Sequence, residues 1–197
     1  MSPQCALTAL ISLLFATVTA KAMISQWPED DGAALLVFKE KLDGGGTTLP
    51  SWNQSTHFCT WQGVICGRRH PERVTTINLT TADLMGQISP SIGNLSFLRN
   101  IFLDDNSLDG EILSSIGRLC CLRFLVLKFN SLDGKIPFEL FNCSELTIIN
   151  LYRNRFVGNV LHWFDSLLVC KNNLTGVIPT LLANAHPSRS WCCTITT

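Results

Sequence analysis

The sequence predicts an α/β fold in which short, similar coils stack into a solenoid with one parallel, concave β-sheet. The main observation is a repeat: similar segments start 24 residues apart, at Val74, Leu98, Leu122 and Leu146, and a fixed period of this length is typical of solenoids. The second observation is an amphipathic segment that begins at Asp30, ahead of the repeats, and ends at the glycines 44–46. An open solenoid end exposes apolar core and an unpaired strand edge, so we expect this helix to form a cap.

Each repeat carries the pattern L-x-x-L-x-L-x-x-N, which is the signature of a leucine-rich repeat. Side chains alternate along a strand, so the last two apolar positions should enter the core while their neighbours face solvent. The Asn follows at the turn, where its amide can satisfy backbone groups of the neighbouring coil. Three copies have this residue in register, at Asn106, Asn130 and Asn154, whereas the first copy has Ala82. Stacking should therefore form an asparagine ladder.

The spacing of the repeats changes at the carboxyl-terminal end of the repeat array. A fifth copy starts at Phe164, only 18 residues after the fourth start at Leu146, so six residues are missing and we expect an irregularity after Val160. In the first four copies a glycine follows the strand, where it would permit a tight bend. These glycines are Gly86, Gly110, Gly134 and Gly158.

The chain divides into four expected parts. Residues 1–22 read as a secretory signal peptide, because an apolar run from Ala6 to Ala20 precedes small residues at a cleavage position. A short membrane anchor is the alternative, since no basic residue precedes that run. Residues 23–73 form the cap, residues 74–182 the repeats, and residues 183–197 an irregular tail. Beyond residue 23 no stretch approaches the roughly 18 apolar residues that a membrane span needs.

Composition narrows the function. The 15 Lys and Arg residues balance 15 Asp and Glu residues, so no net charge attracts nucleic acid or anionic lipid. Five N-x-S/T sequons fit a secretory route and are candidate glycosylation sites: Asn53, Asn78, Asn94, Asn142 and Asn173. The state of six cysteines stays open between thiols and bridges; these are Cys120, Cys121, Cys143, Cys170, Cys192 and Cys193.

Several motifs of the sequence resemble those of a known family. The order A-L-L-x-F-K at 34–39, S-W-N at 51–53 and C-x-W-x-G-V-x-C at 59–66 resembles the cap of plant leucine-rich-repeat receptor-like kinases. The run G-K-I-P at 134–137 is similar to the plant-specific repeat subclass, and residues 68–74 look like those of immune receptors that sense microbial ligands. The resemblance covers about residues 29–182.

The resemblance implies a disulfide between Cys59 and Cys66 and structural roles for Trp52 and Trp61 in the cap. No second cysteine pair and no histidine pair lies at zinc spacing, so we expect no metal and no cofactor. The sequence lacks the Gly-rich loop, the H-R-D motif and the D-F-G motif of a kinase. We therefore expect no enzymatic activity from this chain and no membrane span in it.

A binding site is expected on the solvent-facing strand positions, because stacking places them in parallel columns and exposed aromatic side chains commonly act as anchors. The candidate residues are Phe102, Asp104, Asp105, Phe124, Val126, Lys128, Phe129, Ile148, Asn150, Tyr152 and Arg153. A glycan on Asn78 would shield the first repeat and direct contacts to repeats two to four.

The leading hypothesis is an extracellular, non-catalytic module, located in the apoplast, or at the plasma membrane if the gene encodes an anchor. Its partner would be a peptide or protein ligand, or a receptor-kinase co-receptor, in plant immune or developmental signalling. Two alternatives remain: a secreted inhibitor of cell-wall-degrading enzymes, and an inactive, truncated receptor fragment.

Overall fold

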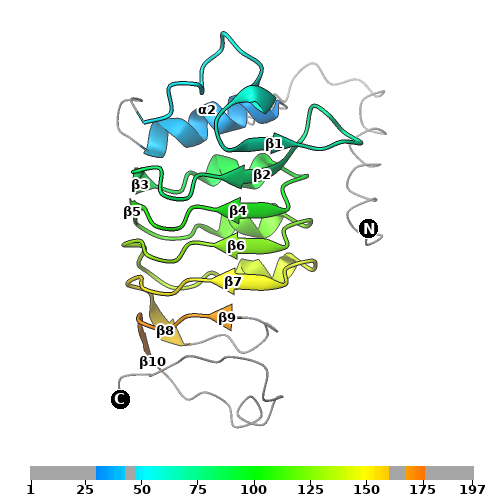
Figure 1. The fold of residues 1–197 in the computed structure, drawn as a ribbon. Helices are drawn as coiled ribbons and strands as arrows, with labels where there is room; N and C mark the ends of the chain where they lie inside the picture. The colour runs from blue at the N-terminus through cyan, green and yellow to red at the C-terminus, as the bar shows by residue number, and fades with distance from the viewer. Residues whose placement is uncertain (1–29, 43–47, 160–166, 176–197) are drawn as a thin grey trace, which may run out of the picture.

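The structure, a computed structural model, describes residues 30–42, 48–159 and 167–175 (Figure 1). The expected signal peptide, the start of the fifth repeat at Phe164, the irregularity after Val160 and the tail at 183–197 lie outside these residues. Figure 1 shows successive coils stacked below a helix, with one strand from each coil aligned in a single sheet. The α/β class is therefore confirmed.

The main sheet has six strands in the order β1-β2-β4-β6-β7-β9. They are β1 (Val64–Cys66), β2 (Val74–Asn78), β4 (Asn100–Phe102), β6 (Phe124–Val126), β7 (Ile148–Asn150) and β9 (Leu167–Leu168). The β1–β2 pair is antiparallel and every later pair is parallel. Equivalent repeat positions face each other, as where Ile101 pairs with Leu125 and Leu125 with Ile149. The fifth copy keeps this register although the fourth repeat before it is six residues shorter, because Ile149 pairs with Leu167.

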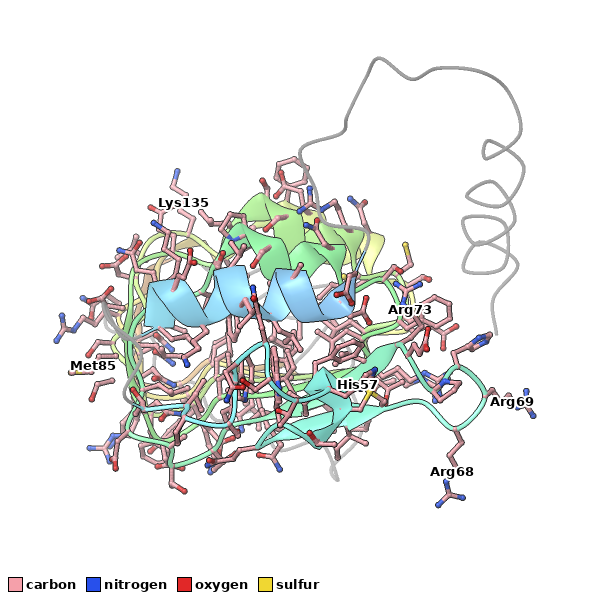
Figure 2. The ribbon with its side chains drawn as sticks, turned by 90° about the horizontal axis from the view of Figure 1, so that it is seen from above. His57, Arg68, Arg69, Arg73, Met85 and Lys135 are labelled. Carbon is pink, nitrogen blue, oxygen red and sulfur yellow. A yellow bond between two sulfur atoms is a disulfide. The ribbon has the colours of Figure 1, made fainter. Side chains whose placement is uncertain are left out.

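Two shorter sheets and a series of 3-10 helices complete the coils. Strand β3 (Met85–Gln87) pairs in parallel with β5 (Ser107–Asp109), and β8 (Val157–Asn159) with β10 (Asn173–Thr175). The 3-10 helices are η2 (Phe58–Thr60), η3 (Pro90–Asn94), η4 (Ser114–Arg118) and η5 (Phe138–Asn142). Figure 2 looks down the stack and shows the 3-10 helices of the repeats across the coil from the main sheet.

The core follows the leucine pattern. The apolar positions of the second repeat, Leu98, Ile101 and Leu103, are 0–1% exposed, and the equivalent residues of the third repeat are equally buried. Full burial of one such side chain contributes about 1.5–3 kcal/mol relative to exposure. The stack is thus held by a continuous apolar interior to which each coil adds the same set of side chains.

Helix α2 (Asp31–Leu42) covers the first coil. Leu35, Phe38 and Leu42 are fully buried, as their shared face predicts. The buried carboxylate of Asp31 accepts a hydrogen bond of 2.6 Å from the backbone N–H of Val74. It also forms an ion pair with the guanidinium of Arg73 at 3.2 Å. These contacts tie the start of the helix to the start of the first repeat strand.

The disulfide between Cys59 and Cys66 is confirmed, with a Cα–Cα distance of 5.5 Å. Trp52 and Trp61 are buried and stack with their ring centroids 5.5 Å apart. The indole N–H of Trp52 donates to the carbonyl of Gln62 at 2.9 Å, so its polar atom is satisfied inside the cap. Both tryptophans therefore serve structure.

The asparagine ladder is also confirmed. The side-chain Nδ2 of Asn130 donates to the carbonyls of Leu103 in the preceding coil at 3.0 Å and Leu127 in its own coil at 3.1 Å. Its Oδ1 accepts from the backbone N–H of Leu108 at 3.0 Å. Asn106, Asn154 and Asn172 make the equivalent bonds. Each amide therefore satisfies buried backbone groups on two coils at once.

The stacking of 3-10 helices requires a glycine at one position. A Cβ at Gly93 would lie 2.3 Å from the carbonyl oxygen of Ser115, and one at Gly117 would lie 2.5 Å from that of Glu139. The same position in the third repeat is Phe141, which is 38% exposed. A coil that stacked on η5 as closely as η5 stacks on η4 would meet the side chain of Phe141. This steric limit coincides with the shortening of the fourth repeat in the sequence.

We predict that Asn130→Ala lowers the free energy of unfolding by about 3 kcal/mol, because an unsatisfied buried backbone group costs roughly 1–3 kcal/mol. Urea denaturation followed by circular dichroism measures the loss. The matched control is Asn150→Ala, since in the described part of the chain the side chain of Asn150 makes a single hydrogen bond, which its Oδ1 accepts from the N–H of Tyr152 at 3.2 Å. Equal losses in the two variants would contradict the role of the ladder.

Candidate functional site

The candidate surface is the sheet face, defined as the side of β4, β6 and β7 opposite the buried Ile101, Leu125 and Ile149. In each of these strands the central residue is buried and its two neighbours are half-buried. The alternation places side chains of the same repeat position in columns across the strands. The face is therefore built by the strands and held in place by the core beneath it.

An apolar stripe crosses the middle of the sheet face and consists of Phe102, Phe124, Val126 and Ile148. The rings of Phe102 and Phe124 stack with centroids 6.5 Å apart and an interplanar angle of 30°. The two rings are diagonal neighbours across β4 and β6. Phe102 lies directly opposite Val126, two residues along β6 from Phe124, and Phe124 in turn pairs with Ile148 of β7. Such aromatic pairs contribute about 0.5–1.5 kcal/mol beyond area burial, so the stripe is preorganised.

A second cluster lies where the strands end. The rings of Phe129 and Tyr152 meet edge to face at 5.4 Å. The ammonium of Lys128 lies 5.3 Å from the centroid of Phe129, and the guanidinium of Arg153 lies 5.4 Å from it. Two cations thus flank one aromatic ring, which is a favourable electrostatic arrangement.

Phe129 adopts a backbone conformation that bulky residues rarely occupy, with φ at +54°. The residue just before the asparagine position, which Ala82 occupies in the first repeat, has positive φ in all five repeats; these residues are Thr81, Asp105, Phe129, Arg153 and Lys171. We name this set the edge column. The positive φ of this position was not predicted from the sequence. The fixed place of the residue before the asparagine in each repeat could have indicated it.

The prediction that Asp104 faces solvent is wrong, because this residue is only 7% exposed. Its carboxylate accepts a hydrogen bond of 2.9 Å from the hydroxyl of Thr80 and pairs with the ammonium of Lys128 at 3.6 Å. Side chains from the two neighbouring strands therefore cover it. Asp105 pairs with the same ammonium at 3.7 Å but keeps a side-chain exposure of 39%.

The cap holds a separate cavity of about 710 Å³ beside the start of α2. Its walls include Asp30, His57, Phe58, Trp61 and Glu72. None of the predicted site residues lines it. Among the described residues, no three His, Cys, Asp or Glu side chains are grouped to hold a metal ion.

Comparisons with known proteins identify the family. A model described as leucine rich repeat N-terminal domain matches residues 28–67. The receptor kinase-like protein Xa21 of Oryza sativa subsp. japonica is 55% identical over 82 residues, or 39% of this chain and 8% of that protein. The solved BIR3–SERK2 complex from Arabidopsis thaliana matches at 30% identity with a TM-score of 0.72, covering 80% of this chain and 90% of that one. The chain belongs to the plant leucine-rich-repeat receptor ectodomains.

A second solved receptor supports the membership of this ectodomain. The leucine-rich-repeat ectodomain of the Arabidopsis thaliana receptor kinase SOBIR1 is 31% identical, with a TM-score of 0.68, covering 83% of this chain and 90% of that one. The match to Xa21 spans less than a tenth of that protein's length. The part of this ectodomain that the structure describes contains no helix long and apolar enough to cross a membrane.

The sequons of this ectodomain differ in exposure. Asn78 is exposed at the end of β2, next to the sheet face, and its Oδ1 accepts from the hydroxyl of Thr80 at 3.1 Å. Asn142 and Asn173 are exposed, and Asn53 is half-buried. The Nδ2 of Asn94, the atom that would carry a sugar, is buried and has no hydrogen-bond partner in the described part of the chain. The structure therefore speaks against the glycan predicted on Asn94.

Cys143 is buried at the end of η5, and its thiol donates to the carbonyl of Ile116 at 3.4 Å. Burial, with a smaller contribution from Cys120, raises the pKa of this thiol from its ordinary value of 9.0 to about 12. Between pH 9 and pH 12 the Cys143 thiol therefore keeps its proton in the folded ectodomain but releases it in the unfolded chain.

We predict that the Cys143 thiol makes this ectodomain lose stability as pH rises from 9 to 12, because unfolding then releases up to one proton from this thiol. The sign follows because the raised pKa favours the neutral thiol, so its stabilisation is complete below pH 9. Urea denaturation at several pH values, compared with Cys143→Ala, isolates this thiol from other titrating groups. Parallel pH profiles for the two proteins would contradict the buried, neutral thiol.

Proposed function

We propose that this chain is an extracellular, non-catalytic recognition module that binds a peptide or protein ligand across the sheet face, in plant immune or developmental signalling. The observation that carries the proposal is the pair of aromatic contacts, Phe102–Phe124 and Phe129–Tyr152, on one half-buried face. Large rigid rings that are partly exposed and surrounded by polar groups are the usual anchors of protein recognition.

The face is suited to binding because it is already ordered. Its strands pair in register and the ladder fixes the turns beyond them, so few side chains need to be immobilised when a ligand arrives. Ordering a rotamer-rich side chain costs about 0.5–1.5 kcal/mol. A rigid face therefore retains more of the contact energy as affinity.

Polar residues limit where the ligand lies. Asn78 and Asn150 flank the apolar stripe, and the Oδ1 atom of each is engaged in a local hydrogen bond. A glycan on Asn78 would cover the amino-terminal end of the face. The contact area is therefore proposed to centre on β4, β6 and β7, where the two aromatic pairs lie.

A receptor-type partner is the second candidate of this proposal. One similar solved structure is a complex of two proteins, BIR3 and SERK2. This likeness supports contact with a co-receptor. Both candidates share the sheet face as the contact surface, so one set of variants tests both.

We predict that Phe124→Ala weakens binding of selected peptides by about tenfold to a hundredfold, because loss of a central anchor costs about 1–3 kcal/mol. The measurement selects dodecapeptides from a random display library on the secreted chain, then determines their dissociation constants by calorimetry.

The matched control is Phe138→Ala, since Phe138 is 68% exposed and begins η5, and the 3-10 helices of the repeats lie across the coil from the main sheet (Figure 2). It should leave the affinity unchanged. Peptides that bind Phe124→Ala as tightly as the wild type, while losing affinity for Phe138→Ala, would reject the sheet face as the site.

A further inference from the structure

We infer that the edge column selects an extended peptide segment carrying a cation and a carboxylate three or four residues apart, with an apolar side chain between them. The inference rests on the proposed function and adds the chemistry of the ligand. Its basis is the order of side chains along the column: Thr81, Asp105, Phe129, Arg153 and Lys171 are neutral, acidic, aromatic, basic and basic in turn.

The acidic end keeps a net negative charge. Asp104 and Asp105 share the single ammonium of Lys128, at 3.6 and 3.7 Å. Two carboxylates against one ammonium leave one charge unbalanced. Asp104 is buried, so Asp105 is the group that meets a ligand. A cationic side chain of a peptide complements this position.

Within the described residues, no carboxylate balances the charges of the basic end. Arg153 and Lys171 are exposed, and among the described residues neither forms an ion pair with a carboxylate. They follow adjacent strands of a parallel sheet, whose spacing is about 4.8 Å, and the N–H of Arg153 donates to the carbonyl of Cys170, just before Lys171. Like charges this close repel each other. A carboxylate placed between them would relieve the repulsion.

Phe129 separates the two ends. Its positive φ costs about 1–2 kcal/mol for a residue of this bulk, whereas Asn would occupy the position at lower cost. Its ring is only half-buried, so core packing does not account for it. The ring instead lies against Tyr152 and Arg153, where an apolar ligand side chain would contact it.

The strand spacing sets the distance between the ligand charges. Arg153 lies two strands from Asp105, or about 10 Å at about 4.8 Å per strand, which equals about three residues of extended chain at 3.3 Å each. Lys171 lies three strands away, or about four residues. Like-charged segments would be rejected, because an unmatched charge costs affinity while a complementary one adds specificity.

The test uses displayed decapeptides with a fixed central Phe and all other positions randomised among Lys, Glu and Ser. Selection on the whole chain should enrich sequences with Lys and Glu three or four positions apart. Selection on Arg153→Glu should enrich Lys at both positions, and Arg153→Asn should lower the affinity of the wild-type ligands at least tenfold. Circular dichroism checks that both variants fold.

The matched control is Arg155→Glu, which makes the same charge change at an exposed residue outside the edge column. It should leave the selected sequences unchanged. One outcome would overturn this inference and leave the proposed function standing: peptides bind the chain and bind Phe124→Ala more weakly, but their sequences show no fixed spacing of Lys and Glu. If no peptide binds at all, from this set or from the random one, both are overturned.

Discussion

The asparagine ladder is the constraint on which the rest of this ectodomain depends. A coil that turns inward beside its neighbour buries backbone N–H and carbonyl groups that water cannot reach. Asn130 satisfies such groups on two coils, through the carbonyl of Leu103 and the N–H of Leu108. Since the same amide recurs in the next coil at Asn154, each coil fixes the position of the following one. Apolar burial drives the stacking, but it is non-directional, so the amides set the register.

The sheet face inherits its geometry from that register. Once the coils are aligned, the residue before each ladder asparagine adopts positive φ, and its side chain joins a column. Such a column tolerates variation because its members do not support the core. A cost appears only where a bulky residue such as Phe129 occupies the strained position. Stability and recognition are therefore separated: the ladder and leucines hold the stack, and the columns vary.

Much of the fold was predictable from sequence, because residues at equivalent positions of a repeat pair with each other when the coils stack. The spacing of Leu98 and Leu122 was enough to place the strands, and the asparagines in step with them indicated the ladder. The steric effect of Phe141 could not be predicted from the sequence. The need for glycine at Gly93 and Gly117 becomes clear only from the position of the neighbouring carbonyl oxygen in the structure.

The candidate site was less predictable, since side-chain environment depends on neighbouring coils. Alternation alone placed Asp104 in solvent, yet Thr80 and Lys128, each 24 residues away, bury it. The buried amide nitrogen of Asn94 is a similar case, because a sequon carries no information about packing. The aromatic pairs were anticipated as residues but not as contacts.

Native-state hydrogen exchange of two backbone amides tests the central claim most directly. The N–H groups of Leu108 and Leu132 donate to the side chains of Asn130 and Asn154. If the ladder holds the stack, both amides exchange only on global unfolding, with the same free energy as the amide of Leu103, which donates to the carbonyl of Val126. Exchange of Leu108 and Leu132 at the rate of an open loop, while Leu103 stays protected, would contradict the account.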